Sequence, residues 1–186
     1  MNKKALILLA DGFEEVEAIT PIDYLKRAGI AVTTAAISNS VTVKGARAKL
    51  HVIADTTLEK LAPGACCFDA IVIPGGMLGA ENLAACKRTS TLLQDMTGAG
   101  KLICAICASP ALVLAPLGLL KNKKFTCYPG MEEKVTGAEW SSDRVVADGN
   151  IITSRAAGTA GEFSIAIISA LLGEDEAKKT ADTVLL

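Results

Sequence analysis

Short apolar runs alternate along the chain with segments in which apolar residues recur every three or four positions. The first run, residues 5–10, ends at Asp11-Gly12, and residues 14–28 follow with apolar side chains at helical spacing. Such runs are typical of buried strands, and such spacing is typical of helices. The pattern also predicts strands at 30–37, 69–73, 102–106 and 125–127, short strands within 41–55, a hairpin at 144–153, and helices at 83–97, 109–120, 159–172 and 174–184.

Strands that alternate with helices are typical of an α/β domain whose mostly parallel sheet is covered by helices on both faces. The composition agrees, because 51% of the residues are apolar but only 4% are aromatic. The core must then consist of alanine, valine, isoleucine and leucine, which suits strands buried on both faces. The sequence shows no repeat, low-complexity tract or linker, and we predict a single domain over residues 1–186.

The charges give no sign of a nucleic-acid or membrane partner. The 19 lysine and arginine residues nearly balance 20 aspartate and glutamate residues, without a basic stripe. Residues 102–120 carry no charge, but Pro110, Pro116 and Gly118 favour a strand and a buried helix over a membrane span. The N-terminal apolar run is too short for a signal peptide, so we expect a cytoplasmic protein with reduced thiols.

Cys107 is the sharpest chemical candidate because it lies where an apolar strand turns directly into a predicted helix. Nucleophile elbows have this arrangement, and a helix start is expected to lower the pKa of a thiol there. The alternative is that Cys107 is a small buried hydrophobe. Cys104 is three residues earlier, within the strand, and so points to the opposite face; we do not expect a redox pair.

Glu17 is the candidate proton carrier, because its helix begins at the same end of the sheet as Cys107. Burial beside a thiolate would raise the pKa of its carboxyl, and the neutral acid could donate a hydrogen bond to the sulfur. The alternative is an ordinary solvated glutamate, as we expect for Glu14 and Glu15.

Gly75 and Gly76 follow another predicted strand, and their N–H groups, together with that of Ala108, could bind an oxyanion. The alternative is that the glycines only turn the chain. His51, the only histidine, alternates with apolar neighbours and shares a side with Lys49, so we expect it to be exposed. We predict no metal site, because Cys66-Cys67 has no second cysteine pair and the chain has one histidine, and no nucleotide site, because no phosphate-binding loop is present.

Four separated motifs, at residues 10–17, 72–80, 105–108 and 153–159, resemble in order and spacing those of the ThiJ/PfpI superfamily. The closest branch is that of the parkinsonism-associated protein deglycases, and the resemblance covers nearly the whole chain. It implies a flavodoxin-like three-layer sandwich, of the class I glutamine amidotransferase-like type, with a cysteine nucleophile elbow. It also implies a homodimer without metal or cofactor.

The resemblance also implies roles for individual residues. Cys107 resembles the family's nucleophile and redox-sensitive cysteine, and Glu17 the carboxyl that hydrogen-bonds it. Tyr128 stands where several members carry a histidine, and Ser109 and Ala157 stand where a member has glycine and proline. The remaining expected site residues are Gly75, Gly76, Ala108, Tyr128, Ser154 and Arg155 in the oxyanion and substrate pocket, and Asp23 and Arg47 near a dimer interface.

Two functions are compatible with these residues. One is a cofactor-independent glyoxalase or protein deglycase, acting through Cys107 and Glu17 on methylglyoxal, glyoxal or early glycation adducts. The other is a non-enzymatic oxidative-stress sensor or redox-regulated chaperone that uses oxidation of Cys107. A protease is a weaker hypothesis without a histidine, and because both main functions use the same residue pair, the sequence leaves them open.

Overall fold

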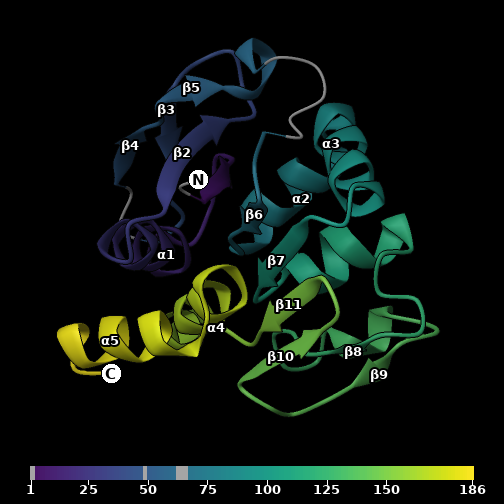
Figure 1. Ribbon diagram of the computed structural model, residues 1–186. Coiled ribbons are helices and arrows are strands. Elements are labelled where there is room, and N and C mark those ends of the chain that lie inside the picture. Colours follow the sequence, from purple (N-terminus) through teal and green to yellow (C-terminus); the bar gives the residue numbers. More distant parts are fainter. Residues whose placement is uncertain (1–2, 48–49, 62–66) are drawn as a thin grey trace.

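A seven-stranded sheet crosses the middle of the molecule in the computed structural model, which describes residues 3–47, 50–61 and 67–186 (Figure 1). The strand order is β10-β11-β7-β6-β1-β2-β5, and neighbouring strands are parallel except for β10 and β11. The strands are β1 (Lys4–Leu9), β2 (Ala31–Ala36), β5 (Thr56–Thr57), β6 (Ala70–Ile73), β7 (Leu102–Ile106), β10 (Val145–Asp148) and β11 (Ile151–Ser154).

The central strands are buried on both faces, which explains why they are continuous apolar runs in the sequence. In β1, Leu6 and Leu8 pack into one apolar cluster, and Ile7 and Leu9 pack into the cluster on the other face. All residues of β6 and β7 are buried. The sheet therefore separates two aliphatic cores.

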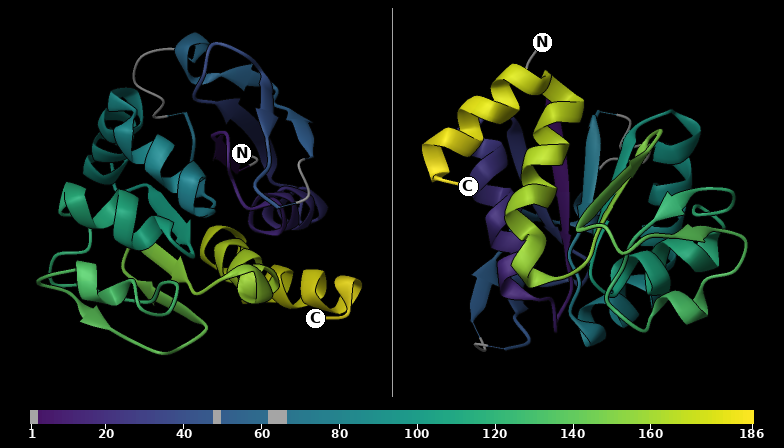
Figure 2. Two further views of the ribbon diagram at one scale, coloured as in Figure 1. Left: turned by 180° about the vertical axis from the view of Figure 1, so that it is seen from behind. Right: turned by 90° about the horizontal axis from the view of Figure 1, so that it is seen from below.

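Helices cover both faces (Figure 2). One core is completed by α1 (Glu15–Arg27) and α4 (Ala160–Leu172), and α5 (Glu174–Val184) packs against α4. The other core is completed by α2 (Met77–Ala85) and α3 (Lys87–Gly98). The three layers confirm the expected flavodoxin-like sandwich.

Two predicted helices differ from the structure. The helix expected at 83–97 is two helices, α2 and α3, because Cys86 between them has an extended backbone. The helix expected at 109–120 is a π-helical turn, Pro110–Leu114, followed by a 3-10 turn, Ala115–Leu117. The Ala115 N–H donates to the Pro110 carbonyl, and Pro116 lacks an N–H, so a regular α-helical ladder cannot continue.

The remaining elements are short. The hairpin of β10 with β11 agrees with expectation, and the short strands expected within 41–55 are β3 (Thr42–Lys44) and β4 (His51–Ile53), which pair antiparallel. A parallel pair joins β8 (Lys124–Phe125) to β9 (Glu139–Trp140). The two-residue strands β5 and β9 were not predicted because they are too short to show a hydrophobic period. Further 3-10 turns span Leu58–Lys60, Glu132–Lys134 and Ala157–Thr159.

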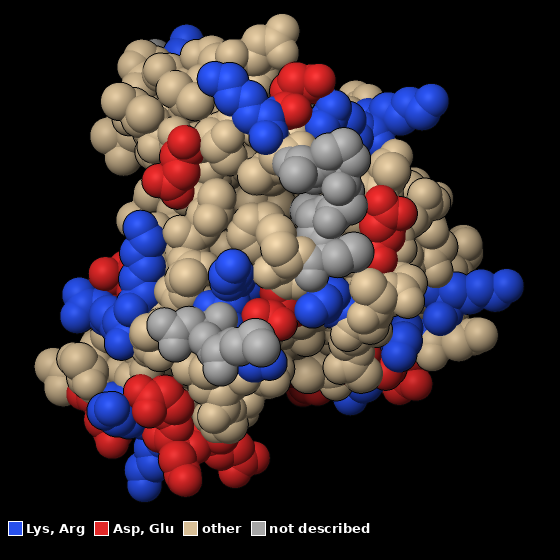
Figure 3. All heavy atoms as spheres, turned by 45° about the horizontal axis from the view of Figure 1, so that its top comes forward, with Lys and Arg blue, Asp and Glu red and all other residues tan. Residues whose placement is uncertain are grey.

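Acidic and basic side chains are intermixed on the face shown in Figure 3, as the balanced composition leads one to expect. Among the helices of the described residues, none has the length and apolar character needed to cross a membrane. Lys49 and Cys66, which entered the predictions above, lie outside the described residues.

Candidate active site

Cys107 begins the turn at the carboxyl end of β7, with a φ of 66°. A non-glycine residue in this left-handed region carries about 1–3 kcal/mol of strain, and it keeps this conformation only when its surroundings hold it in place. Here the Cys107 N–H donates to the Ser154 carbonyl (2.9 Å), and the Tyr128 N–H donates to the Cys107 carbonyl (2.8 Å). The strained turn, held from both sides, is the nucleophile elbow that the sequence predicted.

Glu17 reaches this turn from the first half of α1, and its side chain is buried. The Gly75 N–H donates to Glu17 Oε2 at 2.8 Å. The carboxyl also hydrogen-bonds the Cys107 thiol and the backbone of Ala157. Burial raises the pKa of Glu17 to about 7, and although these three hydrogen bonds oppose the rise, the charge of Glu14 adds to it. Glu17 is therefore not an ordinary solvated glutamate, which was the alternative left open by the sequence.

The Cys107 thiol does not have the low pKa that its position in the sequence predicts. Burial raises its pKa to about 12, and the Glu17 carboxylate contributes to the rise, against a lowering by the N–H groups of Gly76 and Ala108. A regular helix does not follow Cys107, so the expected dipole is weaker. After burial, the largest effect on the pKa of the Cys107 thiol is the negative charge of the ionised Glu17 carboxyl next to the sulfur.

The two groups therefore titrate as a pair. When Glu17 holds its proton, the repulsion disappears and the carboxyl O–H can donate to the sulfur, which favours the thiolate. With a pKa of about 7, Glu17 is protonated in a large share of molecules near neutral pH. The reactive combination supported by this geometry is a neutral Glu17 beside a Cys107 thiolate.

The raised pKa of Glu17 predicts a pH dependence of stability. Between about pH 4.5 and 7 the folded protein keeps a proton that the unfolded chain releases, so the free energy of unfolding falls as pH rises. The fall expected from this group is about 3 kcal/mol. Denaturant unfolding of Cys107→Ala and of Cys107→Ala/Glu17→Gln at pH 4.5, 6 and 7.5 isolates the effect, because only the first protein keeps the carboxyl. Parallel stability curves for the two proteins would contradict the raised pKa.

The glycine turn divides its N–H groups between the two reactive residues. The N–H groups of Gly76 and Ala108 hydrogen-bond the Cys107 sulfur. The Gly75 N–H, also expected in the oxyanion pocket, donates to Glu17 instead. A Cβ on Gly75 would lie 2.6 Å from Cys107 Cβ, and Gly76 has a φ of +84°, so this turn requires glycine at both positions.

The other expected pocket residues surround the elbow without contacting the sulfur directly. The Tyr128 side chain is exposed, and only its backbone N–H is bonded to Cys107. Ser154 is buried, with its Oγ donating to the Arg144 carbonyl (2.9 Å). Arg155 donates to the Ser142 carbonyl (3.1 Å), and its charge acts on Cys127, whose pKa burial raises to about 12.

The two residues expected near a dimer interface both have partners within the chain. Asp23 accepts a 2.7 Å hydrogen bond from Arg27 Nε on the same helix. The backbone N–H of Arg47 donates to the Glu15 carboxylate (3.0 Å), and its exposed side chain reaches Glu14. Glu15 is buried, contrary to expectation, and the dimer assignment of Asp23 and Arg47 stays a prediction.

His51 is exposed on β4, as predicted. Within the described ranges, no three histidine, cysteine or acidic side chains are arranged to hold a metal ion.

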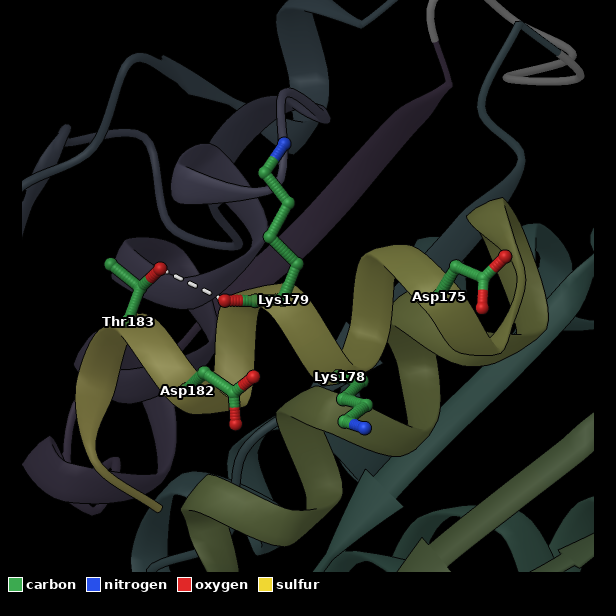
Figure 4. Close-up of a pocket in the computed structure, with 5 residues that line it drawn as sticks. All are labelled: Asp175, Lys178, Lys179, Asp182 and Thr183. Atoms are coloured by element: carbon green, nitrogen blue, oxygen red, sulfur yellow. Dashed lines mark hydrogen bonds between the residues drawn. The ribbon is translucent and has the colours of Figure 1, made fainter.

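A surface hollow of about 430 Å³ lies along α5 and is lined by Asp175, Lys178, Lys179, Asp182 and Thr183 (Figure 4). All five side chains come from that one helix, so this hollow is separate from the Cys107 site.

Ser109 and Ala157 were singled out in the sequence only as departures from the family, without a role at the site. The buried Ser109 donates its hydroxyl proton to the Pro74 carbonyl at 2.6 Å, and the backbone of Ala157 contacts Glu17. A backbone donor has no signature in residue type, and the serine acts through a peptide group. The sequence signal available was their position in the cysteine and Thr-Ser-Arg motifs.

The model of the DJ-1/PfpI family matches residues 3–170 of the chain. The chain belongs to the DJ-1/PfpI family. Its relatives include DJ-1 homolog A of Arabidopsis thaliana, 42% identical over 97% of this chain but only 45% of the relative. The chain thus spans less than half the length of this plant relative. The glutathione-independent glyoxalase DJR-1.2 of Caenorhabditis elegans is 37% identical over 94% of this chain and 92% of the relative.

The fold agrees with solved structures of DJ-1 proteins. The structure of oxidised Toxoplasma gondii DJ-1 superposes with a TM-score of 0.93, at 36% identity and with 98% of each chain covered. The family includes the named glyoxalase of Caenorhabditis elegans. In this chain, the residues available for such chemistry are the elbow cysteine, Cys107, and the buried Glu17.

Proposed function

We propose that this protein is a cofactor-independent glyoxalase and protein deglycase that acts on methylglyoxal, glyoxal or early glycation adducts. The observation that carries the proposal is the pairing of a half-buried cysteine at a strained elbow with a buried glutamate whose pKa is about 7. Such a pair places a nucleophile next to a proton carrier whose charge changes near neutral pH. A relative named as a glutathione-independent glyoxalase supports the same chemistry.

The reaction begins with attack of the Cys107 thiolate on the aldehyde carbon of methylglyoxal. The carbonyl π electrons move to oxygen, and the resulting alkoxide takes the Glu17 proton to give a hemithioacetal. The N–H groups of Gly76 and Ala108, which already contact the sulfur, are near the developing oxyanion and can stabilise it. No histidine is required at this step.

Glu17 then carries a proton from the former aldehyde carbon to the neighbouring carbon. Removal of the proton gives an enediolate, the proton of the C1 hydroxyl moves to the C2 oxygen, and return of the Glu17 proton to C2 gives the thioester of lactate on Cys107. Water adds to the thioester carbonyl and releases lactate and the thiol. The overall conversion is methylglyoxal plus water to lactic acid, so it balances without a redox partner.

The test of this function is the appearance of lactate from methylglyoxal in the absence of glutathione, measured as product. Loss of methylglyoxal is not a sufficient signal, because protein thiols and amines bind the aldehyde reversibly. In D₂O, a proton that exchanges on Glu17 between the two carbons is expected to leave deuterium at C2 of lactate. Lactate formed without any C2 deuterium would argue against the glutamate shuttle while leaving the activity itself established.

A second candidate function is an oxidation sensor, or a redox-regulated chaperone, built on the same cysteine. It is favoured by the partial exposure of Cys107 next to a carboxyl that can donate to an oxidised sulfur, and by the existence of an oxidised DJ-1 structure. It predicts a discrete +32 Da species at Cys107 under mild peroxide. Earlier oxidation of Cys66 or Cys86, resolved by mass spectrometry, would exclude it.

The assembly and compartment are proposals of the same kind. We propose a cytoplasmic homodimer in which Asp23 and Arg47 lie near the contact between subunits. Exposed apolar side chains on the same part of the surface, Val16 and Ile19 on α1, support an interface there. Sedimentation of the wild type and of Ile19→Asp tests it: a dimer for the first and a monomer for the second are expected, and a monomeric wild type would contradict it.

A further inference from the structure

One peptide group connects Ser109 to Glu17. The Ser109 hydroxyl donates to the Pro74 carbonyl at 2.6 Å, and the N–H of the same Pro74–Gly75 peptide donates to Glu17 Oε2 at 2.8 Å. Ser109 and Glu17 are both buried, so water does not compete for these bonds. Hydrogen bonds in series polarise one another, and a donor at the carbonyl end strengthens the N–H donor at the other end.

Ala157 supplies a second donor to the same carboxyl. It is the first residue of the 3-10 turn Ala157–Thr159, so its N–H has no acceptor within the turn and bonds Glu17 instead. The turn is fixed by Thr159, whose Oγ1 accepts from the Ala156 N–H (3.1 Å) and lies 2.6 Å from Ser154 Oγ. The direction of the Ala157 N–H is therefore set by a buried network.

The N–H groups of Gly75 and Ala157 both donate to the Glu17 carboxyl and not to the Cys107 thiol. The N–H groups that bond the sulfur are those of Gly76 and Ala108. Among the described residues, the titratable groups that act on Glu17 are Cys107 and Glu14. Glu14 in turn lies 3.4 Å from Arg47 Nε, and Glu15 receives the Arg47 N–H.

We propose that Ser109 and Ala157 are positioning residues that set the pH range in which the Cys107–Glu17 pair becomes reactive. This inference rests on the residue pair of the proposed function. A donor stabilises the carboxylate relative to the neutral acid. When the pair loses its first proton, the donors favour loss from Glu17, which leaves the thiol protonated. Without them, Glu17 keeps its proton to higher pH, and more of the singly charged pair exists as thiolate.

The most direct test is Ala157→Pro, because proline lacks the N–H and is well tolerated at the first position of a helical turn. The preceding Ala156 has φ −169° and ψ −178°, an extended conformation that a following proline accepts. The readout is the rate of Cys107 alkylation by iodoacetamide from pH 5 to 9, resolved by mass spectrometry from the other cysteines.

We expect the midpoint of the alkylation profile to rise by about one pH unit in Ala157→Pro, and the rate above pH 8 to rise by up to about tenfold, as loss of a hydrogen bond to a charged group implies. The rate at pH 5 is expected to stay at the wild-type value, because there the thiolate forms directly from the neutral pair. A change confined to the upper part of the profile is not what a distorted site would produce.

Two further variants keep the test decisive. Ala157→Ser retains the N–H and is expected to have the wild-type midpoint. Ser109→Ala is expected to shift the midpoint in the same direction as Ala157→Pro. Its rate above pH 8 is expected to rise by only about threefold, because the Ser109 hydroxyl acts on Glu17 through a peptide group. Equal midpoints in Ala157→Pro and Ala157→Ser, or a uniform loss of rate at every pH, would overturn the proposal. Alkylation needs no aldehyde substrate, so the result stands whether or not the wild type forms lactate.

Discussion

Replacement of Glu17 by glutamine is expected to reduce kcat/KM for lactate formation by about 10²- to 10⁴-fold, the range that general acid–base catalysis supplies. Glutamine keeps the shape of the side chain and an oxygen for the Gly75 N–H, but it cannot accept or release a proton near neutral pH. The sulfur remains in place, so Cys107 is expected to react with iodoacetamide as a nucleophile. The loss should therefore appear in turnover and spare alkylation.

Glu81→Gln is the matched control, because it removes one carboxylate from an exposed position on α2 without touching the site. It is expected to leave kcat/KM at the wild-type level. If Glu17→Gln also turned over methylglyoxal at the wild-type rate, the glutamate would not carry the proton, and the mechanism proposed here would be wrong.

Alanine at Gly75 is expected to lower turnover by about 100-fold and the free energy of unfolding by about 1–3 kcal/mol. The added Cβ would lie 2.5 Å from Glu17 Oε2 and 2.6 Å from Cys107 Cβ, both well inside contact distance. Either the carboxyl or the elbow must move, and the bond from Gly75 N–H to Glu17 is lost or lengthened. Lactate kinetics and denaturant unfolding measure the two effects separately.

Gly98→Ala is the control for this change, since a Cβ at Gly98, at the end of α3, meets no atom within 4 Å. Its turnover is expected to equal that of the wild type. Wild-type turnover in Gly75→Ala would instead show that the close packing of the glycine turn against the reacting pair has no catalytic consequence.

Most of the sheet could be predicted because its strands are buried on both faces and so are continuous apolar runs. The strands β1, β6 and β7 appear where residues 5–10, 69–73 and 102–106 predicted them. The helical segments were harder. The extended backbone of Cys86 and the missing N–H of Pro116 interrupt helices at single positions, and such local effects do not change the hydrophobic pattern.

The reacting pair could be predicted, but its electrostatics could not. Position in the chain places Cys107 at a strand end and Glu17 on the helix beside it. The pKa of each group depends on burial and on the distance between the two, which only the folded structure supplies. The use of the Gly75 N–H by Glu17 follows from backbone geometry that a glycine pair in the sequence does not specify.

Whether Cys107 makes this protein a glyoxalase is decided by lactate formation from methylglyoxal, without glutathione, in the wild type and in Cys107→Ser. Serine keeps the size and the backbone of the elbow but lacks a thiolate near neutral pH. We expect lactate from the wild type and none above background from Cys107→Ser. Lactate from neither protein, or equal amounts from both, would contradict this expectation.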